Sequence, residues 1–353
     1  MYYGNVEEYS TYLKLRVGAT SANLGPGFDC LGIALDYYDE LEVWCKTRQC
    51  SSPAIVEVAG QNAPENTSNL IYRVLNNEVE RLYNEQASGE KMRITKIRCH
   101  NFVPHARGLG SSSVALVGAI FAAKITSEAL KRGSFAFSFN ELKSFADYTA
   151  QRGTQIEGHA DNVKPCCYGG LTFSADGAWW MLGEKPKSRR VYARDDLRLA
   201  AFISDEKLST ASARGVIPKD LPEVECEKSK ANLVHLLDLL TRTTSQNENY
   251  EKKEGEELDE FMEATTDYIH QGRRSGLYQS SVDLMNKLRS RGVPAVISGA
   301  GPTVLALWTA GSYKSCSRVL RDADLLADSP TTWKVKYLKP SNCGVQILSG
   351  TIL

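Results

Sequence analysis

The spacing of apolar residues along this chain predicts both strands and helices. Residues 13–17 alternate apolar and polar side chains, which is the period of a strand with one buried face. In residues 69–83 the apolar side chains recur every three or four positions, so we expect a helix with one buried side. Further strands are predicted at residues 41–46, 55–58, 92–100, 171–174 and 197–204, and further helices at residues 111–129, 139–151, 230–241, 258–271 and 276–291.

The order of these elements favours an α+β fold. Strands and helices are mixed along the chain without a clear strand–helix–strand nucleotide unit, so we expect layers of helices packed on sheets. Residues 1–12 are predicted to be a short N-terminal extension. The stretch at residues 243–257 has almost no apolar residue, and we expect it to be a solvated loop.

Composition and charge narrow the class of protein. The chain has 353 residues, of which 42% are hydrophobic and 24% charged, and its formal net charge is zero. Proteins that bind nucleic acid or membrane surfaces rely on broad basic patches, so we expect neither partner here. No apolar run is expected to reach the roughly 18 residues that a membrane-spanning helix needs.

The cysteines indicate a reducing compartment. There are nine, an odd number, with no Cys-x-x-Cys pair that would suggest zinc. The opening residues are polar and acidic, unlike those of a secretory signal. We therefore expect reduced thiols in a cytoplasmic protein.

Residues 103–113, Val-Pro-His-Ala-Arg-Gly-Leu-Gly-Ser-Ser-Ser, form the strongest candidate for a ligand site. Glycines let the backbone approach a ligand closely, and the helix predicted to follow would present unpaired N–H groups to an anion. The spacing matches neither a P-loop nor a Rossmann fingerprint. A phosphate seat is predicted, and the alternative is a loop that merely starts a helix.

Two other glycine-rich segments add polar groups and turns. At residues 17–32, a Gly-Pro-Gly turn lies between Asn23 and Asp29, whose side chains can project toward one point. At residues 295–308, a buried strand is predicted to run into a glycine turn and out into a second apolar run. Each segment also fits a plain turn or hairpin without a ligand.

Together these segments resemble the motifs of the GHMP kinases, a family of small-molecule kinases, and within it most closely those of the homoserine kinases. The resemblance is carried by five blocks, at residues 20–29, 104–113, 156–163, 208–218 and 298–303. It implies an ATP-binding N-terminal domain of the ribosomal protein S5 domain 2 type at residues 13–172. It also implies a ferredoxin-like C-terminal domain at residues 173–353, with the substrate between the two.

The resemblance implies a kinase that uses ATP and Mg²⁺ to phosphorylate the hydroxyl of L-homoserine in threonine biosynthesis. The nucleotide phosphates would be held by the loop and the helix start, at Pro104, Arg107, Gly108, Leu109, Gly110, Ser111, Ser112 and Ser113. Ser112 would also be a magnesium ligand, with Glu157 as the second. Many homoserine kinases have a glutamate where this chain has Gln151, and a neutral amide is a poor ligand for Mg²⁺.

The resemblance further implies a small amino-acid substrate, bound by Asn23, Asp29, His159, Asn162, Arg214 and Arg274. Asp29 would pair with the ammonium group, and both arginines would bind the carboxylate, because guanidinium–carboxylate contacts are strong and directional. Asp161 and Arg214 are assigned to catalysis. Asp161 would act as a general base, although in-line positioning of the hydroxyl could suffice, and an Asx turn is the plain alternative.

Two short stretches depart from the homoserine kinase pattern. Gly272 and Arg273 stand where proline and tyrosine are usual, and residues 163–168 are bulkier and more basic than the usual small residues. Both departures are expected at the acceptor pocket. Two alternatives therefore stay open: a GHMP-type kinase for another small alcohol, and a scaffold repurposed for isomerisation or binding, with Gln151 marking a lost metal site. A homodimer through exposed strand edges is also open.

Overall fold

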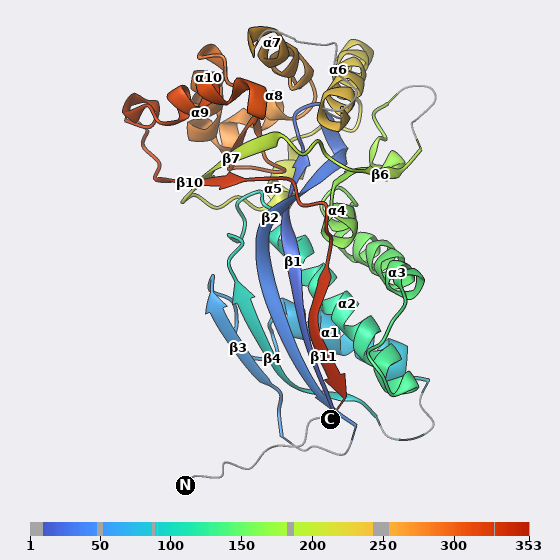
Figure 1. Cartoon of the computed structure of the whole chain (residues 1–353). Helices are drawn as coiled ribbons and strands as arrows, with labels where there is room; N and C mark the ends of the chain where they lie inside the picture. Colours follow the sequence, from blue (N-terminus) through green and yellow to red (C-terminus); the bar gives the residue numbers. More distant parts are fainter. Residues whose placement is uncertain are drawn as a thin grey trace.

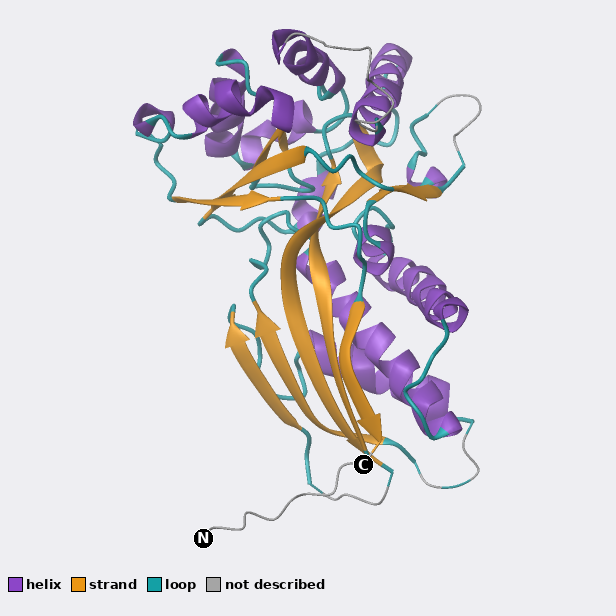
Figure 2. Cartoon of the chain, viewed as in Figure 1, coloured by secondary structure: helices purple, strands orange, loops and turns teal. Residues whose placement is uncertain are grey.

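The computed structural model describes residues 10–47, 52–86, 89, 91–181, 187–242, 254–327 and 329–352. In Figure 1, a tall sheet with helices on one face forms one part of the molecule, and a smaller sheet covered by helices lies across its upper end. Figure 2 shows helices and strands in separate layers in both parts. The predicted α+β class is confirmed.

The larger sheet is built around two long antiparallel strands. Its seven strands are β1 (Thr11–Asn23), β2 (Gly27–Lys46), β3 (Ile55–Gly60), β4 (Arg93–Asn101), β5 (Leu171–Phe173), β6 (Arg189–Val191) and β11 (Gln346–Ile352). The main path runs β11-β1-β2-β4-β3, while β5 pairs with β2 and β6 pairs with β5. All pairs are antiparallel except β3 with β4.

Strand β2 is much longer than residues 41–46, for which the alternating pattern predicted a strand. Its first nine residues are all buried, so no polar position alternates with the apolar ones there. The last seven residues of β1 are buried in the same way. A strand that is covered on both faces has no period of two in its sequence, which explains the missed length. These buried halves carry the Gly-Pro-Gly turn into the centre of the molecule.

Four helices belong to the N-terminal part: α1 (Leu70–Val79), α2 (Ser111–Arg132), α3 (Phe139–Glu157) and α4 (Val163–Tyr168). The predicted helix at residues 69–83 continues past α1 as a π-helical turn at Glu80–Asn84. Helix α2 is long and apolar enough to cross a membrane by length and composition, which corrects the expectation that no apolar run reaches that length. Because 78% of its apolar window is buried inside the protein, α2 is a core helix of this part.

The smaller sheet has four antiparallel strands, β7 (Leu197–Ser204), β8 (Ala295–Ile297), β9 (Val304–Thr309) and β10 (Trp333–Leu338). Between β7 and β8 lie α5 (Thr210–Gly215), α6 (Glu223–Thr241), α7 (Glu254–Ala264), α8 (Gln271–Arg274) and α9 (Gln279–Ser290), and between β9 and β10 lies α10 (Tyr313–Leu320). The sheet order is β10-β7-β9-β8. With β8 and β9 joined directly, this is the β-α-β-β-α-β arrangement of a ferredoxin-like sheet.

One predicted helix in this part is interrupted. Instead of spanning residues 258–271, α7 ends at Ala264 and a turn precedes α8. The Asp267 carboxylate accepts hydrogen bonds from the backbone N–H groups of residues 269, 270 and 271 at 3.0, 2.9 and 2.6 Å. A short acidic side chain that bonds nearby backbone competes with helix continuation. Helix α7 also begins at Glu254, inside the predicted loop at residues 243–257, whose residues 243–253 lie outside the described part.

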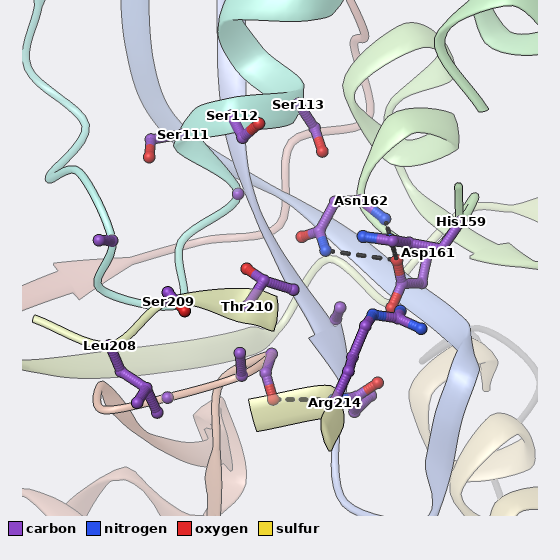
Figure 3. A pocket seen from close by; sticks show the side chains of 18 of the residues that line it. Ser111, Ser112, Ser113, His159, Asp161, Asn162, Leu208, Ser209, Thr210 and Arg214 are labelled. Atoms are coloured by element: carbon purple, nitrogen blue, oxygen red, sulfur yellow. Dashed lines mark hydrogen bonds and ion pairs between the residues drawn. The ribbon is translucent and has the colours of Figure 1, made fainter. Parts of the chain in front are cut away.

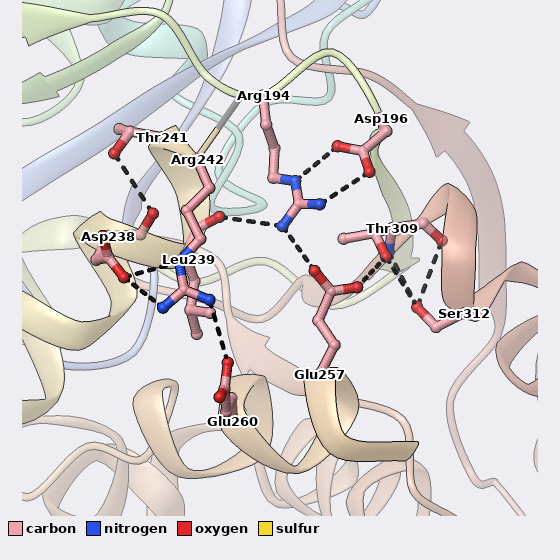
Figure 4. A network of polar contacts seen from close by, with 10 residues as sticks. All are labelled: Arg194, Asp196, Asp238, Leu239, Thr241, Arg242, Glu257, Glu260, Thr309 and Ser312. Carbon is pink, nitrogen blue, oxygen red and sulfur yellow. Dashed lines mark hydrogen bonds and ion pairs between the residues drawn. The ribbon is translucent and has the colours of Figure 1, made fainter. Parts of the chain in front are cut away.

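A polar network fastens α6 and α7 to the smaller sheet (Figure 4). Arg194, just before β7, donates to both carboxylate oxygens of Asp196 at 2.6 and 2.9 Å and to Glu257 on α7 at 2.8 Å. Glu257 in turn accepts from the hydroxyl of Thr309, at the end of β9, at 2.5 Å. Arg194 also donates to the carbonyl of Leu239 on α6 at 3.3 Å. One guanidinium thus connects two helices to the ends of two strands.

The end of the chain returns to the larger sheet. After β10, strand β11 pairs with β1, and Ile352 lies opposite Thr11. Strand β1 begins inside the predicted extension at residues 1–12, of which residues 1–9 lie outside the described part. One hydrophobic core includes Leu31 of β2 and Leu197 of β7 and so spans both sheets. A domain division near residue 172 stays a prediction, and β11 lies with the N-terminal sheet in any such division.

Candidate active site

A cavity of about 190 Å³ lies where the two parts meet, and Figure 3 shows it from close by. All five sequence blocks reach this cavity. The predicted site residues that line it are Asn23, Asp29, Arg107, Gly108, Gly110, Ser111, Ser112, Ser113, Glu157, His159, Asp161, Asn162, Arg214 and Arg274. They come from the β1–β2 turn, the start of α2, the end of α3 and the segment after it, α5 and α8.

The loop before α2 requires glycine at two positions. Gly108 and Gly110 have φ angles of +79° and +69°, a region that side chains disfavour. A Cβ atom on Gly108 would lie 2.2 Å from the carbonyl oxygen of Ser298, and one on Gly110 would lie 2.0 Å from the hydroxyl of Thr20. The loop therefore packs directly against the other two glycine-rich segments.

The start of α2 has the geometry of an anion site. Gly110 offers no capping side chain, so the first N–H groups of this 22-residue helix are left for a ligand. The first turn holds Ser111, Ser112 and Ser113 and no acidic residue, and the positive end of the helix dipole lies here. In Figure 3 this turn lies at one side of the cavity, with Thr210 of α5 across from it.

Glu157, the last residue of α3, lies beside this turn. Its carboxylate accepts hydrogen bonds from the hydroxyls of Ser112 at 3.1 Å and Ser113 at 3.4 Å. Hydroxyl and carboxylate oxygens beside a phosphate seat are ligands that Mg²⁺ prefers, so this donor set fits the ion. Within the described residues, no three His, Cys, Asp or Glu side chains gather to hold a metal. An ion here would take its other ligands from phosphate and water.

A histidine–aspartate pair follows α3. His159 Nδ1 lies 2.5 Å from Asp161 Oδ1, and the same oxygen accepts from the backbone N–H of Asn162 at 2.9 Å. Burial opposes both charges, yet the contact between the two side chains raises the pKa of His159 and lowers the pKa of Asp161. Asp161 is therefore an ionised carboxylate and a weak base. The hydroxyl of Thr20 donates to Asn162 Oδ1 at 2.7 Å and ties this segment to β1.

Asp29 and Arg214 form a two-pronged ion pair at the cavity wall. The guanidinium donates to Asp29 Oδ2 at 3.0 Å and to Oδ1 at 2.7 Å. The sequence predicted separate contacts with the charged groups of a substrate, whereas here the two side chains bind each other. A carboxylate can accept further hydrogen bonds beside a bidentate arginine, so Asp29 can still receive an ammonium group.

Asn23 and Arg274 are more deeply engaged with the protein than predicted. The Asn23 side chain accepts from the backbone N–H of Asp29 at 3.0 Å and donates to the carbonyl of Gly299 at 2.8 Å, so it joins two glycine-rich segments. Arg274 is 2% exposed and donates to the carbonyl of Ala213 at 2.7 Å. Burial lowers the pKa of Arg274, and no carboxylate of the described residues lies at ion-pair distance from it. Arg274 therefore lines the cavity as a buried cation without a direct ion-pair partner among the described residues.

Two predicted nucleotide contacts do not line the cavity. Leu109 is completely buried, and its carbonyl accepts from the N–H of Thr20 at 3.2 Å. Pro104 is buried as well, so both residues support the loop from behind. Ser209 and Thr210 line the cavity but are absent from the predicted set. The sequence feature that could have identified them is the adjacent pair of hydroxyl residues within the block at residues 208–218.

The departures from the homoserine kinase pattern lie away from this cavity. Arg273 forms an ion pair with Glu225 on α6 at 2.5 Å and donates to the carbonyls of residues 268 and 269. Neither Gly272 nor any residue of 163–168 lines the cavity, which corrects the expectation that they alter the acceptor pocket. Gln151 is exposed and also lies outside it, whereas Glu157 is part of the wall.

Comparison with known proteins adds sequence relatives that extend over most of the chain. A profile of the GHMP kinases N terminal domain matches residues 69–170. The homoserine kinase of Streptomyces avermitilis is 35% identical over 310 residues, which are 87% of this chain and 89% of that protein. The homoserine kinase of Streptomyces coelicolor is 35% identical over 298 residues, 84% of each chain.

Solved structures share the fold. The crystal structure of homoserine kinase from Cytophaga hutchinsonii has a TM-score of 0.69 at 20% identity, covering 99% of this chain and 100% of that one. A crystal structure of mevalonate kinase has a TM-score of 0.58 at 14% identity, covering 94% and 99%. At such identities the structures support the fold alone, and the sequence relatives carry the closer assignment. The chain therefore belongs to the homoserine kinases, within the GHMP kinase family.

Proposed function

We propose that this protein transfers the γ-phosphate of ATP to the side-chain hydroxyl of L-homoserine, giving O-phospho-L-homoserine and ADP as a step of threonine biosynthesis. The observation that carries the proposal is that one cavity joins an anion site to charged groups of both signs. Ser111 at the start of α2 lines the same cavity as Asp29 and Arg274. A zwitterionic alcohol and a phosphate donor therefore have complementary partners in one place.

The nucleotide side is the first turn of α2. Its N–H groups and dipole favour the phosphates, and the Gly108 and Gly110 backbone can approach them closely. Ser112 and Glu157 would hold Mg²⁺, which, when bound, neutralises charge on the β- and γ-phosphates. Without the ion, the Glu157 carboxylate would repel a triphosphate bound beside it. A cation between them would remove this repulsion, and the hydroxyls of Ser112 and Ser113 lie next to the carboxylate that would bind it.

The acceptor side is the group of charges around Asp29. The substrate ammonium would bind the Asp29 carboxylate, and its carboxylate would bind Arg274, the cation that has no ionic partner among the described residues. Arg214 holds Asp29 in place with two hydrogen bonds and adds a second positive charge for the substrate carboxylate. Two arginines and one aspartate therefore offer partners for both charges of a zwitterionic amino acid.

The chemical step requires positioning more than a strong base. The hydroxyl oxygen forms a bond to the γ-phosphorus while the bond to the bridging oxygen breaks, and ADP leaves with the electron pair. Asp161 would accept a hydrogen bond from the hydroxyl and receive its proton late in the transfer. Its lowered pKa suits this limited role better than early proton abstraction.

The sequence left two alternatives open, a kinase for another small alcohol and a scaffold repurposed for isomerisation or binding. The residues that suggested them lie outside the cavity. A different alcohol was suggested by residues that do not line the cavity, and a lost metal site by Gln151, which lies outside it. Cytoplasmic location and a homodimer stay predictions.

The test is ADP release by the purified protein with Mg²⁺ and ATP, in the presence and absence of L-homoserine. We expect strong homoserine dependence, loss of activity in Glu157→Ala, and near wild-type activity in the matched control Gln151→Ala. Release with another small alcohol but not with homoserine would overturn the choice of acceptor. Absence of release with any acceptor, from folded protein, would overturn the kinase assignment.

A further inference from the structure

A second and larger cavity, of about 660 Å³, lies between α3, α4 and the β5–β6 pair. None of its lining residues lines the active-site cavity. It includes Lys164, Cys167 and Tyr168 of the basic, bulky stretch that departs from the homoserine kinase pattern. The unusual residues of α4 therefore have a place in the structure that the proposed reaction does not use.

The walls of this second cavity are largely apolar. Leu142 and Ala146 of α3 face Phe173 of β5 and Cys167 of α4, and the last two are buried. Phe139, the first residue of α3, is 80% exposed at the same cavity. Cavities of roughly 300–1,000 Å³ with apolar walls and a few polar groups are typical of small-molecule sites.

The charges at this cavity are predominantly positive. Lys143, Lys164, Arg189 and Arg190 line it, against one carboxylate, Asp147. That carboxylate already accepts a hydrogen bond from the hydroxyl of Tyr168 at 2.9 Å. Arg190 donates to the carbonyls of Gly169 and Asn342 at 3.1 and 2.6 Å, so it is committed to the protein.

Lys164 is the cation best placed to meet a ligand. It is half-buried, and burial lowers the pKa of its ammonium group, an effect that the attraction of Asp176 does not cancel. Among the described residues, its ammonium group makes no hydrogen bond or ion pair, and Asp176 attracts it without forming one. A partly desolvated cation beside an apolar wall is stabilised by an anion that brings its own apolar body.

Helix α4 connects this cavity to the active site. It has six residues and starts directly after Asn162, so Lys164 is two residues from a side chain that lines the active-site cavity. The segment is tightly packed, because a Cβ on Gly32 would lie 1.7 Å from the carbonyl oxygen of Asp161 and 2.9 Å from the Pro165 ring. Because Asp161 and Asn162 directly precede α4 and share its packing against β2, a change in the position of α4 would be passed on to them.

We propose that the cavity between α3, α4 and β5–β6 binds a small organic anion with an apolar body, of the medium-chain carboxylate class, and that its occupancy alters phosphorylation through α4. The anionic group would meet Lys164, and the apolar body would cover Ala146 and Phe173. The effect on phosphorylation rests on the proposed function, whereas the binding itself does not.

Binding is tested by isothermal titration of the full-length protein with octanoate and, as the uncharged match, 1-octanol. We expect one octanoate per chain and at least tenfold weaker binding of octanol. Lys164→Gln should weaken octanoate at least tenfold, and Ala146→Trp, which fills the cavity, should abolish binding. Lys314→Gln, at an exposed lysine of α10, is the matched control and should bind as the wild type does. Circular dichroism and melting temperature establish that each variant is folded.

The coupling is tested by the rate of homoserine phosphorylation at saturating octanoate. We expect at least a threefold change in KM for L-homoserine in the wild type and no change in Ala146→Trp. No saturable octanoate binding, or binding that both variants leave intact, would overturn the site. Site-specific binding without any kinetic change would overturn the coupling. Because calorimetry does not depend on turnover, an inactive enzyme would refute the kinase assignment and leave the binding result to be judged separately.

Discussion

Gly110→Ala and Gly133→Ala place the same methyl group at the two ends of one helix. The backbone is nearly identical at the two sites, with φ 69° and ψ 21° at the start of α2 and φ 71° and ψ 23° at its end. A Cβ at Gly133 meets no atom within 4 Å, whereas one at Gly110 lies 2.0 Å from Thr20 Oγ1 and 3.0 Å from Asn162 Oδ1. Backbone strain is thus common to both variants, and the steric conflict belongs to Gly110 alone.

The expected losses follow from these contacts. An alanine in the left-handed region costs about 1–2 kcal/mol, which is the full effect expected for Gly133→Ala. In Gly110→Ala, Thr20 must also rotate away from its 2.7 Å hydrogen bond to Asn162. Thr20 is completely buried, so losing this bond costs a further ~1–3 kcal/mol. We expect the free energy of unfolding to fall by about 2–5 kcal/mol in Gly110→Ala.

Urea unfolding followed by tryptophan fluorescence measures the stability of both variants, and homoserine-dependent ADP release measures their activity. A displacement of about 1 Å at a reacting group can cost roughly 100-fold in rate, so Gly110→Ala should lose at least about tenfold in kcat/KM. Gly133→Ala should retain its activity below its unfolding transition. Equal losses of stability and activity in the two variants would refute the role assigned to the contact with Thr20.

Three further predictions concern single side chains. Asp29→Asn should raise the KM for L-homoserine by about 10- to 100-fold, because hydrogen bonds to charged groups contribute about 1.5–3 kcal/mol. The KM for ATP should not change. An unchanged KM for homoserine in steady-state assays would contradict the ammonium contact. Asp161 raises the pKa of His159 above its ordinary value of 6.5, although burial acts in the opposite direction. The ion pair therefore contributes its full stabilisation below pH 6.5, and this stabilisation is lost as the pH rises through the raised pKa. His159→Gln should therefore lower the free energy of unfolding more at about pH 5.5 than at about pH 9, and urea titrations at both pH values that show the opposite order would reject this sign. Arg273→Tyr should leave the homoserine KM within about twofold of wild type, because its guanidinium lies outside the cavity, and steady-state kinetics that show a large increase would contradict that placement.

The sequence was sufficient to select residues that line one cavity because the motifs that carry them are continuous in the chain. Glycine at 108 and 110 supplies the positive φ angles that the loop adopts, and the hydroxyls follow at once, so a candidate anion site could be predicted from this segment alone. The strand at residues 41–46 was recognised because one of its faces is polar. The first half of β2 was missed because both of its faces are buried, which removes the alternation.

Side-chain direction was the part that sequence could not supply. Arg273 was expected in the acceptor pocket, but Glu225, 48 residues away in the chain, draws it to α6. Leu109 was expected to contact nucleotide, but its side chain is completely buried. Lys164 follows the active-site segment closely and yet lines a different cavity. Each outcome depends on contacts between distant segments, which local pattern does not encode.

The return of β11 to the first sheet has a consequence for synthesis. A ribosome makes β1 long before β11, so one edge of β1 has no partner until residues 346–352 have emerged. An unpaired strand edge is a site for pairing with other chains, and a contact so distant in sequence forms late. The N-terminal part can therefore begin to fold during translation but cannot close its sheet. Nascent chains that stall before residue 346 would carry an open edge, and these incomplete chains are the ones expected to aggregate.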